Sequence, residues 1–248
     1  MRRIVVTLVM SLVILTAVSF APAELVSHWK FDEGSGDTAF DSADGNHGTI
    51  YGAQWTTGVF NGALSFDGYQ DYVYVGHKDN LESQTLTLSF WAQIDNPMRD
   101  NNGGVANGEI FGNVNMYTYK LNFFEGIAQA SVVDTTYKHY AISTDIVDSD
   151  WHMWTMTADN GILKLYKDAI FADEINYPEQ IAYVGDFFVI GARYDGDYSL
   201  QGKIDDVRVY NHALSVEEIH DILPEPGSIL LLSFGGLFLS RRQRKITK

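Results

Sequence analysis

The chain contains no cysteine among its 248 residues, so no disulfide bond can stabilise it. Positive charge is also scarce, with 17 lysines and arginines against 32 aspartates and glutamates. Ten of the basic and 31 of the acidic residues fall within residues 24–224, which gives this segment a net charge of −21. Such a segment repels phosphate backbones and anionic lipid, and we therefore expect no nucleic-acid partner.

Motifs for catalysis are missing as well. No strand carries carboxylates at adjacent same-face positions, as glycoside hydrolysis would need, and there is no serine elbow or phosphate loop. The seven histidines show no zinc spacing, and His152 and His212 are interpreted as strand and turn positions beside the core. The sequence therefore predicts a protein that is not an enzyme.

The first 23 residues have the pattern of a signal peptide. Two arginines precede an apolar run over residues 4–20, and small residues then lead to Ala23. We expect signal peptidase to cut between Ala23 and Glu24, after transient contact with the membrane. An uncleaved membrane anchor is the alternative, but the run is short for a membrane span.

From Leu25 onward, short β-forming segments are separated by turn residues, which is the spacing of an all-β sandwich or barrel. The clearest strand covers residues 86–94, in which Leu86, Leu88, Phe90, Ala92 and Ile94 share one face. Residues 151–158 and 162–167 flank an Asn160-Gly161 pair, which is typical of a tight hairpin turn.

Two polar loops are candidates for ligand binding. Residues 98–108 are interpreted as one long loop without an apolar face, and a second loop precedes the last strand. We expect both loops to lie at one rim of the sandwich. Their candidate ligand residues are Asp100, Asn102, Asn107, Asp195 and Asp197.

Residues 202–219 combine a strand with the start of a helix. Ser215 stands three residues before Glu218, with Leu214 and Ile219 beside them, which predicts a capping box and a hydrophobic staple. A short helix over residues 216–222 follows, ended by Pro224.

The strand before this helix contains a break in phase. Ile204 falls on one face of an ideal strand, whereas Val207 and Val209 fall on the other. Either a bulge lies at Asp205 and Asp206, or Asp205 points inward and needs a hydrogen-bonding partner or a metal ion.

Several landmarks, in this order, resemble the laminin-G-like jelly-roll domains of the concanavalin A-like lectin and glucanase fold. They are Trp29 to Gly36; Gly62 to Gly68; Leu88 to Trp91; Trp151 and His152; Leu163 to Asp168; and Gly202 to Tyr210 with Ala213 to Ile219. The resemblance covers residues 26–223, so we assign residues 24–223 to this domain. It implies an all-β, two-sheet antiparallel jelly roll with a short C-terminal helix. One departure is Ala169, where such domains usually have glycine.

Related folds often hold a structural calcium ion between the first strands and the last. The resemblance therefore nominates Asp205 together with Asp32, Asp41, Asp44 or Asn46, because calcium prefers oxygen ligands. The alternative is that these are turn residues that cap backbone amides.

Trp91 is a candidate for stacking against a sugar, because it faces away from Leu88 and Phe90. The alternative is that its ring packs under a neighbouring loop or the second sheet, as most aromatic side chains do.

Residues 224–248 resemble a PEP-CTERM sorting signal of Gram-negative envelopes. Pro224, Glu225 and Pro226 precede an apolar run over residues 229–239, and a basic cluster follows, which includes Arg241 and Arg242. In that family an exosortase reads the tripeptide, and the tail is removed during transfer to the cell surface. A plain C-terminal anchor is the alternative.

These features predict an exported binding module at the cell surface, the outer envelope or the extracellular matrix, without catalytic activity. Its expected partner is a polysaccharide or a surface protein, with calcium as the only expected cofactor. A structural or adhesive envelope protein that binds no glycan is one alternative, and a glycoside hydrolase of the same fold is another.

Overall fold

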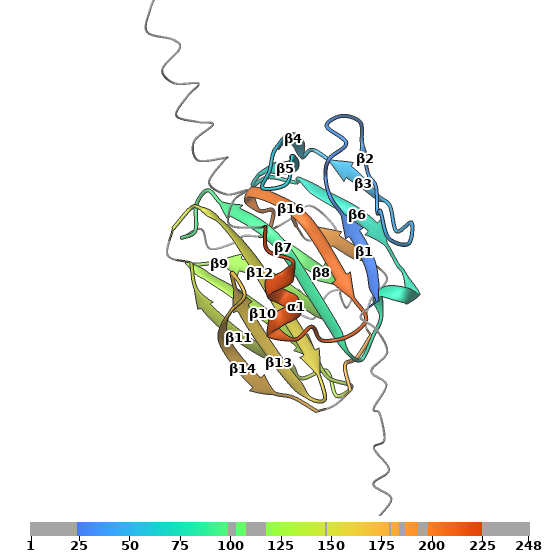
Figure 1. Ribbon diagram of the computed structural model, residues 1–248, viewed down its shortest axis with the longest axis vertical. Helices are drawn as coiled ribbons and strands as arrows, with labels where there is room; N and C mark the ends of the chain where they lie inside the picture. Colours follow the sequence, from blue (N-terminus) through green and yellow to red (C-terminus); the bar gives the residue numbers. More distant parts are fainter. Residues whose placement is uncertain are drawn as a thin grey trace, which may run out of the picture.

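The computed structural model describes residues 24–98, 103–107, 118–146, 148–178, 180–183, 187–192 and 198–224. Within these residues, two antiparallel sheets pack face to face as a sandwich, and one short α-helix follows the last strand (Figure 1). The predicted all-β jelly-roll architecture is therefore confirmed.

Sheet A has the strand order β14-β13-β12-β7-β16-β5-β4, with β1 also paired to β16. Its strands are β1 (Leu25–Trp29), β4 (Gln54–Thr57), β5 (Gly62–Asp67), β7 (Leu86–Ile94), β12 (Trp151–Asp159), β13 (Ile162–Lys167), β14 (Ile170–Asn176) and β16 (Gln201–Tyr210).

Sheet B has the strand order β11-β10-β9-β8-β15-β6-β3-β2. Its strands are β2 (Thr38–Ala39), β3 (Gly48–Tyr51), β6 (Tyr72–Gly76), β8 (Gly104–Asn107), β9 (Tyr119–Phe124), β10 (Ile127–Val133), β11 (His139–Asp145) and β15 (Phe188–Ile190). A single 3-10 turn, η1 (Asp79–Leu81), precedes β7 in the described part of the chain.

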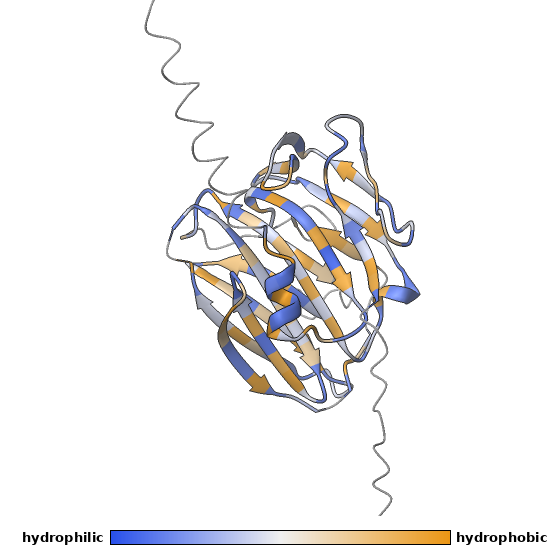
Figure 2. Ribbon diagram, in the orientation of Figure 1, coloured by the Kyte–Doolittle hydropathy of each residue, from blue (hydrophilic) through white to orange (hydrophobic). Residues whose placement is uncertain are grey.

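The core lies between the sheets, where hydrophobic residues alternate with hydrophilic ones along many strands (Figure 2). Aromatic rings from the two sheets interlock there. Trp29 stacks on Phe188 with ring centroids 5.2 Å apart, and Phe123 meets the rings of Phe90 and Trp154 edge to face at 6.1 and 5.5 Å. Because no disulfide is available, this packing must supply most of the stability.

Strand β7 has the predicted bounds and the predicted faces. The alternating set that begins with Leu86 and ends with Ile94 is buried in the core, and Trp91 points to the opposite face of sheet A. The hairpin between β12 and β13 also follows the sequence, because Asn160 and Gly161 both have positive φ, at 46° and 74°.

Helix α1 (Val216–Asp221) covers the outer face of sheet A, in front of β7 and β12 (Figure 1). The predicted capping box is present, because Glu218 N donates to Ser215 Oγ at 3.3 Å and Ser215 N donates to Glu218 Oε2 at 2.7 Å. Leu214 and Ile219 are both buried against the sheet, as the staple requires.

Strand β16 changes partners along one of its edges. Its first part, Gln201 to Ile204, pairs with β5, and its last part, Val207 to Tyr210, pairs with β1. The register against β7 on the other edge shifts between Asp205 and Arg208, and Asp206 has a φ of 55°. The predicted bulge is therefore present, and Asp205 is also fully buried. The inward alternative is wrong, because Asp205 pairs with Trp91 on the outer face of sheet A, whereas Ile204 and Val207 both face the core.

The prediction of one long loop over residues 98–108 is wrong in part, because residues 104–107 form β8 between β9 and β15. Val105 is buried in the core from this strand. A Cβ on Gly103 would lie 2.0 Å from Gly191 O, and one on Gly104 would lie 2.2 Å from Leu121 O. These glycines, which suggested a loop, permit close approach of neighbouring backbones instead.

The turn between β13 and β14 keeps glycine-like geometry without glycine. Asp168 and Ala169 have φ of 53° and 61°, and neither residue is glycine. Alanine with a left-handed backbone costs about 1–2 kcal/mol, so this turn is strained.

We expect Ala169→Gly to raise the free energy of unfolding by about 0.5 kcal/mol, because relief of strain exceeds the loss of one buried methyl group, about 0.8 kcal/mol. Urea unfolding at an unchanged m value measures this gain. Ala63→Gly is the matched control, since Ala63 is buried in β5 with no positive φ, and we expect it to lower stability by about 1 kcal/mol or more. A loss of stability in both variants would contradict the strain.

Candidate functional site

Asp41 holds a loop that follows β1 and β2. Its Oδ1 accepts hydrogen bonds from the amides of His28 (2.7 Å) and Ala43 (2.9 Å). Its Oδ2 accepts from the amides of Asp44 (3.3 Å) and Asn46 (2.9 Å). Burial disfavours the charge, but these four donors outweigh it and lower the pKa of Asp41. Asp41 therefore acts as a cap for backbone amides.

Asn46 and Asp44 tie the same loop to η1. The side-chain Nδ2 of Asn46 donates to Ser27 Oγ at 2.7 Å and to Asn80 Oδ1 at 3.2 Å. Asn80 Nδ2 in turn donates to Asp44 Oδ2 at 2.7 Å. The Asn46 carbonyl accepts from Trp29 Nε1 at 2.8 Å, so this loop also positions a central ring of the core.

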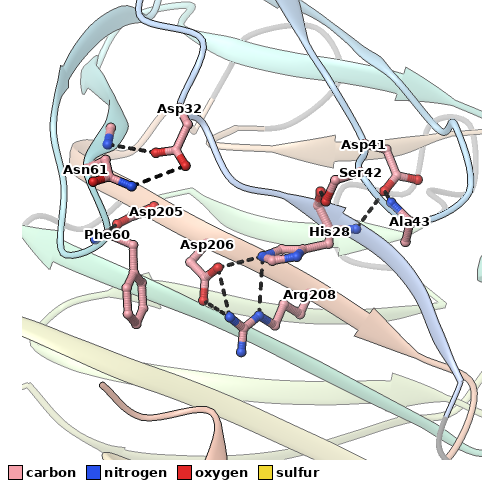
Figure 3. A network of polar contacts seen from close by, with 11 residues as sticks. His28, Asp32, Asp41, Ser42, Ala43, Phe60, Asn61, Asp205, Asp206 and Arg208 are labelled. Carbon is pink, nitrogen blue, oxygen red and sulfur yellow. Dashed lines mark hydrogen bonds and ion pairs between the residues drawn. The ribbon is translucent and has the colours of Figure 1, made fainter. Parts of the chain in front are cut away.

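Two other carboxylates hold the turn between β4 and β5. Asp32 Oδ1 accepts from Gly62 N at 2.9 Å, and Asp205 Oδ2 accepts from Phe60 N at 2.8 Å. Gly58 is required beside them, because a Cβ there would lie 2.4 Å from Asp205 Oδ2. Figure 3 shows Asp32 and Asp41 at opposite ends of this polar group, with His28 between them.

Asp206 forms the centre of a buried ion-pair network on the outer face of sheet A (Figure 3). His28 Nε2 lies 2.6 Å from Asp206 Oδ1, and Arg208 Nη2 lies 2.9 Å from Asp206 Oδ2. This network links β1 to β16 immediately after the bulge. Asp205 therefore binds the β4–β5 turn, whereas the adjacent Asp206 binds β1.

The five residues nominated for calcium do not converge. Asp32 and Asp205 hold one turn, whereas Asp41, Asp44 and Asn46 hold another loop. Within the described ranges there is no group of three or more His, Cys, Asp or Glu side chains placed to hold a metal ion. As they lie here, these residues do not fit a shared calcium site, and Asp41 and Asp32 match the alternative of turn residues that cap amides. Calcium binding by the protein stays a prediction.

Asp205 has the most perturbed environment in this region. Burial raises its pKa to about 7, and the nearby charges of Asp206 and Asp32 act in the same direction. Its Oδ1 has no hydrogen-bond partner among the described residues. A carboxyl with a raised pKa beside an ionised one is typical of glycosidases, but Asp205 is 0% exposed and cannot reach a glycosidic oxygen.

Trp91 lies directly opposite Asp205 in the sheet and is 6% exposed. Its ring packs beneath α1 with Met153, Tyr210 and Ile219, and Phe60 meets it edge to face at 6.3 Å. The packing alternative therefore describes Trp91, which offers no exposed ring on which a sugar could stack. The outer face of sheet A is occupied here by α1 and the β4–β5 turn.

Four of the loop candidates, Asp100, Asn102, Asp195 and Asp197, lie outside the described residues. The chain on either side of them can be placed. Gly191 N donates to Gly104 O at 2.7 Å, and Leu200 N donates to Gly191 O at 2.6 Å, so both loops begin or end at the same rim. Asn107 occupies the other end of β8, opposite Tyr119 and Phe188. The candidate set is therefore divided between the two ends of one strand.

The processing signals fall largely outside the described residues, which exclude Ala23 and residues 225–248 and so Glu225, Pro226, Arg241 and Arg242. Glu24 is described, and its carbonyl accepts from Asn211 N at 3.2 Å. Pro224 is described three residues after α1. In the part of the chain that the structure covers, no helix is both long and apolar enough to cross a membrane.

His152 lies between two carboxylates, a contact that its interpretation as a strand position did not include. Its Nδ1 is 2.6 Å from Asp168 Oδ2, and its Nε2 is 2.8 Å from Asp148 Oδ1. Hydrogen bonding to His152 lowers the pKa of Asp148. Asp168 also accepts from Met153 N at 2.9 Å, so the group fastens the strained β13–β14 turn to β12. His212 follows β16, with its ring 6.1 Å from that of Tyr210.

An exposed aromatic surface on sheet B was missed by the sequence analysis. Tyr51 of β3 pairs with Tyr72 of β6, and their rings stack at 4.8 Å. Tyr74 follows on the same face, with its ring 6.3 Å from that of Phe187. We call Tyr51, Tyr72, Tyr74 and Phe187 the tyrosine surface. Tyr51 is 46% exposed and Tyr74 is 38% exposed.

The signal for this surface was present in the sequence. Tyr72, Val73, Tyr74 and Val75 alternate, so burial of both valines in the core turns both tyrosines outward. Only the pairing of β6 with β3 brings Tyr51 beside them, and that pairing cannot be read from the sequence.

Comparison with known proteins identifies the class. Residues 67–220 match the family described as the concanavalin A-like lectin/glucanases superfamily, and the chain belongs to this family. No curated protein matches the chain.

Solved structures share the fold at low sequence identity. Domain 4 of AbnA, a GH43 extracellular arabinanase from Geobacillus stearothermophilus, in complex with arabinotriose, has 19% identity and a TM-score of 0.64 over 80% of this chain and 98% of that one. The botulinum neurotoxin serotype D ligand binding domain in complex with N-acetylneuraminic acid has 16% identity and a TM-score of 0.63 over 80% and 50%. The binding domain of Paraclostridial Mosquitocidal Protein 1 has 17% identity and a TM-score of 0.62 over 80% and 51%. The chain thus spans about half the length of the two toxin domains.

The raised pKa of Asp205 predicts an unusual pH dependence of stability. Between about pH 4 and pH 7 the unfolded carboxyl ionises while the folded one keeps its proton, so the folded state binds more protons and stability falls as pH rises. We expect Asp205→Asn to remove this fall. Relative to its effect at pH 4, the substitution should raise the free energy of unfolding at pH 8 by on the order of 3 kcal/mol. Urea unfolding across this pH range measures it.

Asp206→Asn is the matched control at the adjacent position. It removes the anionic partner of Arg208, and we expect it to lower stability at pH 8 by about 2 kcal/mol or more. If both variants lost stability equally at pH 8, Asp205 would be ionised and well solvated in the folded protein.

Proposed function

We propose that this chain is an exported, non-catalytic module that binds polysaccharide at the cell surface or in the extracellular matrix. The family includes both lectins and glucanases, so membership alone leaves the activity open. Two solved structures of the same fold are complexes with arabinotriose and with N-acetylneuraminic acid, which supports carbohydrate as the ligand class.

The tyrosine surface is the observation that carries this proposal. Exposed aromatic rings on a rigid sheet offer flat apolar area with hydroxyl groups at the edge, which suits the apolar face and the hydroxyls of a sugar. Grouped aromatic residues that stay exposed on a folded domain mark interaction sites more often than isolated ones do.

Three carboxylates of the candidate site support the absence of catalysis. Asp205, whose pKa suits a general acid, is fully buried under the β4–β5 turn. Asp41 has both oxygens occupied by backbone amides, and Asp206 is paired with Arg208. A glycosidase would need two carboxylates that reach one glycosidic bond, and these three do not.

Export is proposed from the two ends of the sequence. Cleavage after Ala23 would leave Glu24 at the N-terminus, where its backbone contact with Asn211 still holds β1 against β16. Processing at Pro224, Glu225 and Pro226 would leave α1 intact and deliver the domain to the outer envelope by way of an exosortase. Mass spectrometry of the secreted protein measures both ends.

A glycan and polysaccharide array, probed with the full chain, tests the proposed function. We expect retention on at least one polysaccharide without any release of reducing sugar. Retention on none of the polymers, with attachment to exopolymer-producing cells intact, would replace this proposal with an adhesive or structural role. Release of reducing sugar would establish a glycosidase instead.

Calcium is tested in the same protein by thermal melts. A rise in melting temperature with added calcium, reversed by chelator, would establish a bound ion. Because Asp41 is saturated by amides, we expect Asp41→Asn to leave any such rise unchanged. A rise abolished by Asp41→Asn would mean that the loop rearranges around calcium.

A further inference from the structure

We propose that the tyrosine surface binds an uncharged polysaccharide segment and discriminates against acidic polysaccharides. This inference rests on the proposed function and adds the site and the chemical class of the ligand.

The rings form two neighbouring pairs on the outer face of sheet B. Tyr51 and Tyr72 are stacked at 4.8 Å with an interplanar angle of 19°, so each ring covers only one face of the other. Tyr74 and Phe187 lie at 6.3 Å with an angle of 39°. Tyr72 and Tyr74 are two residues apart on one strand, which places the pairs about 7 Å from each other. Together they give a continuous aromatic strip across β3, β6 and the start of β15.

The strip is held on a rigid base. On the reverse side of β6, Val73 and Val75 are buried in the core. Ile50 is buried in the same way on the reverse side of β3. The backbones of the two strands are joined in register from Thr49 to Tyr51. A ligand would therefore meet rings that are already positioned, which lowers the entropic cost of binding.

The charges around the strip are negative. Asp67 ends β5 and Asp71 directly precedes β6, and Asp71 Oδ2 accepts from Asp67 N at 2.8 Å. Asp37 precedes β2 at the same edge of the sheet, where its carbonyl accepts from Ile50 N at 2.7 Å. Lys120 of β9 belongs to the same row of cross-strand neighbours as Tyr74, three strands away. It is only 8% exposed.

This balance favours an uncharged ligand. The segment that contains the strip has a net charge of −21, so a carboxylated or sulfated polymer would meet repulsion as it approached. A neutral sugar meets no such barrier, and the exposed carboxylate of Asp67 is an acceptor for hydroxyl groups. Added salt would screen the repulsion and weaken the discrimination.

Matched polymers test the ligand class. Biotinylated arabinan, mannan and hydroxyethylcellulose are each compared with a carboxymethylated derivative by biolayer interferometry on the full chain. We expect tighter binding to the neutral member of each pair that binds, by about tenfold or more at low ionic strength, with the gap narrowing at high ionic strength.

Substitutions test the site. We expect Tyr51→Ala and Tyr74→Ala each to weaken binding to the neutral polymer by about five- to tenfold, whereas Tyr51→Phe, which keeps the ring, retains most of it. Tyr137→Ala is the matched control, because Tyr137 is 58% exposed in the turn between β10 and β11, away from the strip. Thermal melts of all four variants should match the wild type, since exposed substitutions change stability little.

The outcomes separate the two proposals. Binding to none of the neutral or acidic polymers would overturn the proposed function and this inference with it. Binding that is equal in Tyr51→Ala, Tyr74→Ala and Tyr137→Ala would leave a polysaccharide-binding module but overturn the tyrosine surface as its site. Tighter binding of the carboxymethylated polymers at low ionic strength would overturn the ligand class alone.

Discussion

The structure depends on the way β16 joins three other strands. One edge pairs with β7, and the other pairs first with β5 and then with β1, so a single strand fastens the N-terminal segment to the middle of sheet A. At the point where the partner changes, Asp205 holds the β4–β5 turn and Asp206 holds His28 of β1. Because of the bulge, these two adjacent side chains bind two different segments of the chain, which a regular strand would not allow.

Both faces of the centre of sheet A are covered. Its inner face forms the core with sheet B, and its outer face is covered by α1, whose capping box and staple set the angle at which it crosses Trp91. Trp91 and Asp205 are buried side by side there as structural groups. On the outer face of sheet B, Tyr51 and Tyr74 stay accessible, and we propose them as recognition elements.

Polar side chains that make several hydrogen bonds, rather than disulfides, hold the loops in place. Asp41 gathers four backbone amides, Asp168 bonds both His152 and an amide of β12, and Asn46 anchors the indole of Trp29. Each of these is an oxygen-rich group that would suit calcium by composition, yet its hydrogen bonds are already made within the chain. Composition cannot distinguish a cation ligand from an amide cap, because the same carboxylate can serve as either. The two roles differ only in which groups its oxygens face in the folded chain.

The elements that can be predicted from sequence are those whose signals are local. The alternation in β7, the Asn160-Gly161 turn, the capping box at Ser215 and the position of the bulge at Asp205 all depend on residues within a few positions of one another. Tertiary contacts are needed to explain why residues 104–107 form a strand, why Trp91 lies under a helix and why Tyr51 stacks on Tyr72. These depend on contacts between segments far apart in the chain, and no local pattern specifies which distant backbone or ring will meet a given residue.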